Sequence, residues 1–142
     1  NQFNLTTRRY TVADLEALMD DPATELYTLA VKDRLSDSGI TGFCILRFGG
    51  TTTRVDTLLL SCRVLGRKIE DVFIAFMASR ALARGNDSLI GEYVPTSKNA
   101  QVEPFYLDRG FESLGEGLFN LNLAQHQAQT FPEIHVEVIA PA

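Results

Sequence analysis

A basic loop with a glycine could bind an anion. Arg63, Gly66, Arg67 and Lys68 lie between a hydrophobic stretch at residues 55–60 and an amphipathic stretch at residues 69–84. The first reads as a buried strand and the second as a helix, so the loop precedes a helix start, where backbone N–H groups lack partners. Such a strand, turn and helix form a site for an anion, most naturally a phosphate. Plain connectivity is the alternative interpretation.

Two features of the same stretch bear on that site. Glu70 and Asp71 lie in the first turn of the helix and are expected to face water, where they add negative charge that a phosphate must tolerate. Cys62 lies at the loop entrance, where a helix start and Arg63 could lower its thiol pKa enough to carry an acyl group. The alternative is that Cys62, like Cys44, is an inert buried thiol.

The elements that must position this loop follow from hydrophobic periodicity and turn residues. Thr11, with Asp14 three residues later, predicts the start of a first helix. We expect strands at residues 3–10, 26–32, 40–48, 55–60, 88–94, 119–123 and 135–139, and helices at residues 11–20, 69–84 and 100–109. This order predicts one α/β domain over residues 1–142, with a mixed sheet and helices on both faces.

The amino-acid composition limits the classes of partner that we expect for this chain. The chain has 142 residues, 45% of them hydrophobic, and a formal net charge of −5. Its arginines are spread rather than clustered, which argues against nucleic acid as a partner. No hydrophobic run approaches the ~20 residues that span a bilayer, so no membrane contact is expected, and we expect a cytoplasmic protein. The first residue, Asn1, suggests a processed or excised chain.

Two motifs together resemble the GNAT N-acetyltransferase fold. Residues 63–68 resemble its acyl-CoA pyrophosphate loop, although Lys68 replaces the usual small residue. Asn99, Tyr106 and the pair Gly110-Phe111 resemble its second signature in type, order and spacing. The resemblance implies a mostly antiparallel sheet of about seven strands. It also implies a cofactor, acyl-CoA or carrier-protein phosphopantetheine, held by Cys62, Arg63, Val64, Gly66, Arg67, Lys68 and Asn99, with no metal.

A closer resemblance covers nearly the whole chain. Residues 1–10, 60–67 and 91–99 are similar to the C-terminal region of FkbH-like proteins, in which a HAD-type domain precedes a GNAT-like domain. This implies a domain excised from such a chain. It also implies two partners, an acyl carrier protein and the HAD-type domain, in the loading of glyceryl units for polyketide-type biosynthesis.

The resemblance assigns chemical roles. Tyr106 is implied as the general acid that reprotonates a departing thiolate, and Glu92 on the fifth strand is the best-placed general base. Asn99 could orient the pantetheine. The alternatives are a Tyr106 packed in the core, a solvated Glu92, and an Asn99 that only caps its helix. Two functions therefore stay open, an acyltransferase and a non-catalytic module that docks a carrier protein. Lys68 and the short acceptor region favour the second, whereas the intact spacing of Asn99, Tyr106 and Gly110-Phe111 favours the first, which is the leading interpretation.

Overall fold

The computed structural model describes residues 2–126 and 131–139. Its elements follow in the order β1 (Gln2–Asn4), α1 (Val12–Met19), β2 (Thr24–Lys32), β3 (Asp37–Gly49), β4 (Thr52–Ser61), α2 (Ile69–Ala83), β5 (Ser88–Glu92), β6 (Glu112–Gly115) and β7 (Leu118–Asn122). Two short 3-10 turns, η1 (Ala100–Val102) and η2 (Leu107–Arg109), lie between β5 and β6. None of the helices described is long and apolar enough to cross a membrane.

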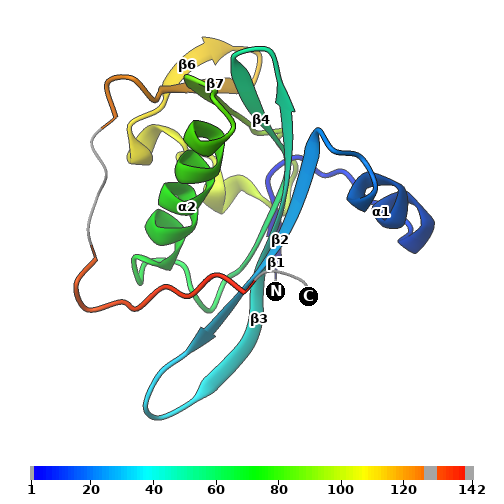
Figure 1. Ribbon diagram of the computed structural model, residues 1–142. Coiled ribbons are helices and arrows are strands. Elements are labelled where there is room, and N and C mark those ends of the chain that lie inside the picture. Colours follow the sequence, from blue (N-terminus) through cyan, green and yellow to red (C-terminus); the bar gives the residue numbers. More distant parts are fainter. Residues whose placement is uncertain (1, 127–130, 140–142) are drawn as a thin grey trace.

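One seven-stranded sheet forms the centre of the molecule, in the order β2-β3-β4-β5-β7-β6, with β1 added beside β4. All pairings are antiparallel except that of β4 with β5. Helix α2 covers one face of the sheet and α1 lies on the other (Figure 1). The predicted fold class, a mostly antiparallel sheet with helices on both faces, is confirmed.

The two helices differ in how many of their side chains are buried. The predicted start of α1 is confirmed, because Thr11 and Asp14 form a complete capping box, yet no residue of α1 is fully buried. In α2 the predicted apolar face is confirmed, since Val72, Phe73 and Met77 are buried. Glu70 was expected to face water and is instead 3% exposed. It is buried because Gly66 and Arg109 supply partners for its carboxylate.

Three predicted elements are wrong in extent. Residues 100–109 form η1 and η2 rather than one α-helix, since Pro104 has no N–H and its ring would clash with an earlier carbonyl. The first strand ends at Asn4, whose Oδ1 accepts the N–H groups of Thr6 and Thr7 and turns the chain. Residues 135–139 form no strand, and their side chains are exposed.

The two parallel strands separate soon after they meet. β4 pairs with β5 only at Thr52–Arg54 and Ser88–Ile90. Beyond this point β4 continues to Ser61 and pairs instead with β1, with Phe3 opposite Leu60 and Asn4 opposite Leu59. The N-terminal strand therefore takes the edge of β4 that β5 leaves.

Candidate functional site

The predicted site residues follow the carboxyl ends of the two parallel strands. The loop of residues 62–68 follows β4, Glu92 ends β5, and Asn99 comes shortly after it. In open α/β sheets, ligands bind in the crevice outside such strand ends. We call the gap between the separated ends of β4 and β5 the β4–β5 cleft.

The N-terminal segment, residues 2–10, occupies this cleft. Leu5 donates its N–H to Leu58 O of β4 at 3.1 Å, and its carbonyl accepts the N–H of Val94, just after β5, at 2.7 Å. Leu5 is 0% exposed and Thr6 is 2% exposed. The backbone of Leu5 therefore connects the β4 side of the cleft to the β5 side, as an added strand does when it completes a sheet.

The side chain of Asn99 also holds the N-terminal segment through a hydrogen bond. Its Nδ2 donates to Asn4 O at 3.1 Å and Val94 O at 2.8 Å, while its Oδ1 accepts from Tyr93 Oη at 3.0 Å and Thr96 N at 2.8 Å. These bonds use both donors and both lone pairs of the amide. The capping role expected for Asn99 is wrong, because its side chain makes no cap bond to η1.

Glu92 is held by two arginines. Its Oε1 lies 2.8 Å from Nη2 of Arg8 and 3.6 Å from Nη2 of Arg54, and its side chain is 15% exposed. The solvated alternative for Glu92 is therefore wrong. Because Arg8 belongs to the N-terminal segment, its ion pair with the Glu92 carboxylate links that segment to the end of β5.

Tyr106 lies inside an aromatic cluster. It is 1% exposed, its ring stacks on Phe119 with centroids 5.6 Å apart, and it lies edge-on to Phe105 at 5.2 Å. A side chain at Gly91 would overlap the ring. Burial raises the pKa of the Tyr106 phenol, and within the described residues its hydroxyl has no hydrogen-bond partner. An unpaired buried hydroxyl is costly in free energy, so this group is one that the described part of the fold leaves unsatisfied.

One N–H group of the predicted anion site is bonded to a carboxylate of the chain itself. Gly66, at φ +82°, donates its N–H to Oε2 of Glu70 at 2.8 Å. Arg109 lies 3.6 Å from Glu70 and 3.0 Å from Asp71, with its guanidinium 4.2 Å from the centroid of the Phe105 ring. Helix α2 therefore begins with an internal anion and its counterion, where a phosphate was expected.

The basic residues of the loop are exposed. Arg63 donates to Ser38 O at 3.1 Å, Arg67 lies 3.6 Å from Asp33, and Lys68 lies 3.2 Å from Glu133.

Val64 is fully buried and anchors the loop. Cys62 is a free, exposed thiol, so its expected burial is wrong, while Cys44 is buried as expected. Lys68 itself adopts the left-handed conformation at the helix start, with φ +66°.

A second polar cluster holds the end of the N-terminal segment. The hydroxyl of Tyr10 donates to Oδ2 of Asp56 at 2.5 Å, and Arg47 and Thr57 donate to the same carboxylate at 3.0 Å each. Burial by itself would raise the pKa of Asp56, but these hydrogen bonds outweigh it and leave the pKa below its ordinary value. Sequence reasoning missed this cluster, because Arg47 and Tyr10 lie 9 and 46 positions from Asp56 in the chain.

Within the described ranges 2–126 and 131–139, no three His, Cys, Asp or Glu side chains are grouped to hold a metal ion. The charged groups described above form two separate sets. Glu92 with Arg8 and Arg54 lies at the end of β5, and Glu70 with Arg109 lies at the start of α2. An arginine of either set is able to bind a phosphate once its internal carboxylate partner is displaced.

Several solved structures similar to this one are described as acetyltransferases. A putative GNAT-family acetyltransferase from Desulfovibrio desulfuricans matches with a TM-score of 0.61 and 15% identity, over 78% of this chain and 76% of that one. The ribosomal-protein-S18-alanine N-acetyltransferase of Escherichia coli matches with a TM-score of 0.59 and 10% identity, over 89% and 86%. An aminoglycoside 6'-N-acetyltransferase complexed with coenzyme A matches with a TM-score of 0.58 and 12% identity, over 83% and 84%.

No protein-family model matches the sequence, and no curated relative was found. At these identities the structural matches establish the fold alone. The chain has the GNAT fold, as its two sequence motifs indicated.

Proposed function

We propose that this GNAT-fold domain is a non-catalytic docking module of an FkbH-like protein, which binds an acyl carrier protein and presents it to a HAD-type catalytic domain for glyceryl-unit loading. The observation that carries the proposal is the backbone bridge of Leu5 across the β4–β5 cleft. A pantetheine arm is an extended chain with two amides, so it would compete with Leu5 for the same N–H and C=O groups.

Three further contacts support a closed cleft. Glu70 holds the N–H of Gly66, the Asn99 amide is saturated by the chain's own groups, and Arg8 pairs with Glu92. Acyl-CoA would have to replace all of them together with the buried side chain of Leu5. Removing a hydrogen-bond partner from a buried group costs roughly 1–3 kcal/mol. Entry of acyl-CoA would incur this cost at each of these contacts and is therefore disfavoured.

The carrier protein would instead meet the outward basic loop. Arg63, Arg67 and Lys68 are exposed; Arg67 and Lys68 form surface ion pairs at 3.6 and 3.2 Å, and Arg63 donates to Ser38 O. Exposed pairs of this kind are worth about 0–1 kcal/mol, so these cations can exchange their partners for an acidic protein surface at little cost. Charge complementarity of this type sets the association rate and the specificity of docking.

A second candidate function is acyl transfer from acyl-CoA or from carrier-bound phosphopantetheine. The unpaired hydroxyl of Tyr106 favours it, since a phenol that stays protonated is the acid a departing thiolate needs. On this candidate the N-terminal segment would leave the cleft before substrate entered, and Glu92, freed from Arg8, would be the base.

Titration with the carrier protein, with and without its phosphopantetheine arm, tests the docking proposal. A docking module binds both forms with equal affinity, because the arm contributes no contact inside the closed cleft. Binding that requires the arm would overturn docking and favour the second candidate. Absence of binding to either form would overturn docking and leave acyl-CoA as the only donor for the second candidate.

A further inference from the structure

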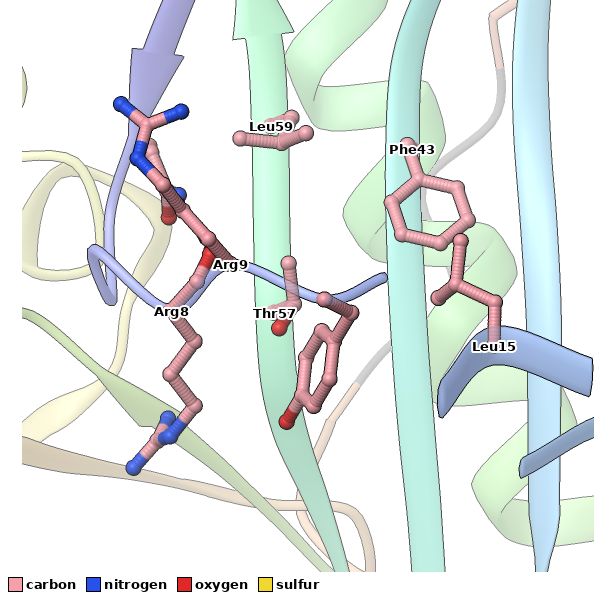
Figure 2. Close-up of a pocket in the computed structure, with 8 residues that line it drawn as sticks. Arg8, Arg9, Leu15, Phe43, Thr57 and Leu59 are labelled. Atoms are coloured by element: carbon pink, nitrogen blue, oxygen red, sulfur yellow. Dashed lines mark hydrogen bonds between the residues drawn. The ribbon is translucent and has the colours of Figure 1, made fainter. Parts of the chain in front are cut away.

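A pocket of about 360 Å³ lies on the sheet face that carries α1, away from α2 and the basic loop. Figure 2 shows Thr57 and Leu59 rising from β4, Phe43 from β3 and Leu15 from α1, with the chain at Arg8 and Arg9 running across them. Phe43 and Leu59 are directly opposite in the β3–β4 register, so they form a continuous apolar floor. The volume falls at the small end of the range typical of small-molecule sites.

Most polar groups of this pocket already have partners. Asn4 accepts the N–H groups of Thr6 and Thr7, Thr57 and Tyr10 both donate to Asp56, and Arg8 pairs with Glu92. Arg9 is different. It is exposed, and no ion pair or side-chain hydrogen bond of Arg9 is found in the part of the chain that the structure describes.

The guanidinium groups of Arg8 and Arg9 point in opposite directions (Figure 2), so Arg9 can receive a ligand without disturbing the Arg8–Glu92 pair. An Arg beside an apolar floor suits a molecule with a hydrophobic body and one anionic end, since the planar fork binds a carboxylate or a phosphate through two parallel hydrogen bonds. The hydrophobic body of such a ligand would pack against the apolar floor formed by Phe43 and Leu59.

We propose that the pocket between α1 and the N-terminal segment binds a small amphipathic anion, with its carboxylate or phosphate on Arg9 and its apolar body against Phe43, Leu59 and Leu15. The proposal is separate from the docking function, because no pocket residue belongs to the basic loop and binding leaves the β4–β5 cleft closed. It adds to the domain a small-ligand site on the opposite side of the sheet.

The test titrates the intact domain with hexanoate, hexyl phosphate and the neutral hexanol, followed by backbone amide shifts. Both anions should shift the amides of Phe43, Thr57 and Leu59, and hexanol should bind at least about tenfold more weakly, as expected for the loss of a charge-assisted hydrogen bond. Preference for hexanoate or for hexyl phosphate tells whether the natural anion is a carboxylate or a phosphate.

Two variants and a control make the test specific. Arg9→Met should weaken hexanoate about tenfold, and Leu15→Gln should weaken both hexanoate and hexanol without unfolding the domain, because α1 has no fully buried residue. Arg34→Met, at the exposed β2–β3 turn, should change nothing. Equal binding of hexanoate and hexanol, an Arg9→Met variant with unchanged affinity, or shifts confined to other residues would overturn the proposal.

Discussion

The N–H of Gly66 and the carboxylate of Glu70 form a 2.8 Å hydrogen bond at the start of α2. This bond places an anion of the chain at the position where the sequence predicts a bound phosphate. Glu70 is 3% exposed and has Arg109 as its counterion. One N–H group of the loop therefore has its partner within the chain, and the effect of Glu70 on folding can be tested first.

Glu70→Ala should lower the free energy of unfolding by about 1–3 kcal/mol, because the Gly66 N–H and the Arg109 guanidinium lose a buried partner. Urea denaturation measures the change. Asp71→Ala is the matched control, since it removes the other carboxylate on Arg109 from a position that is 31% exposed. We expect it to cost less than about 1 kcal/mol. An equal loss in both variants would contradict the role given to Glu70.

Asn99→Ala should loosen the N-terminal segment more than the rest of the fold. The variant removes the bond from Asn99 Nδ2 to Asn4 O, next to the Leu5 bridge. Hydrogen exchange of the Leu5 amide should accelerate by about tenfold or more, which corresponds to roughly 1.4 kcal/mol of lost protection. The exposed Asn122→Ala is the control. If the Leu5 amide exchanges at the same rate in both variants, Asn99 does not hold the segment.

Asp56 predicts a dependence of stability on pH. Its folded-state pKa lies below the ordinary value of 3.8, so its contribution is complete above about pH 4 and is lost as the pH falls through the folded-state pKa. Asp56→Asn should therefore cost about 1–3 kcal/mol at pH 7, and the difference from the wild type should shrink below about pH 4. Urea denaturation at several pH values measures it. A difference that does not change with pH would rule out the charge of Asp56 as its cause.

Tyr106→Phe separates the two functions. Because the hydroxyl has no partner among the described residues, its removal should leave the free energy of unfolding within about 1 kcal/mol of the wild type, or raise it. A docking module should also keep glyceryl transfer by the full-length protein unchanged. Loss of transfer with carrier binding intact would assign Tyr106 a catalytic role and favour the second candidate.

Arg63→Ala combined with Arg67→Ala should weaken binding of the carrier protein, and the loss should diminish as salt rises. The physical reason is that exposed charges are screened over about 8–10 Å at physiological ionic strength. Surface plasmon resonance at two salt concentrations measures the effect. Arg34→Ala, an exposed arginine outside the 62–68 loop, is the control. Docking through the basic loop is excluded if the double variant binds as the wild type does at low salt.

Local sequence signals were enough for most of the fold. Thr11 with Asp14 and the spacing of Val72, Phe73 and Met77 depend on neighbouring residues, and both predictions are confirmed. The two GNAT-like motifs are also local, and the fold that they predicted is confirmed. Pro104 carries a signal that the helix prediction for residues 100–109 overlooked. Its missing N–H alone argues against a continuous helix there.

The closure of the cleft could not be predicted from the sequence in the same way. It depends on Leu5 meeting Leu58 and Val94, and on Asn4 meeting Asn99, which are 95 positions apart. The amino-acid types in residues 1–10 indicated a strand but not which strand it joins. Burial of Glu70 likewise required Arg109 to approach from a distant turn.

Calorimetric titration of the intact domain with acetyl-CoA tests the central claim most directly. The account predicts no binding at concentrations up to about 1 mM, because Leu5 holds the backbone groups of both walls of the β4–β5 cleft. Micromolar binding of acetyl-CoA, accompanied by shifts of the Leu5, Leu58 and Val94 amides, would contradict it and show that the cleft opens to its cofactor.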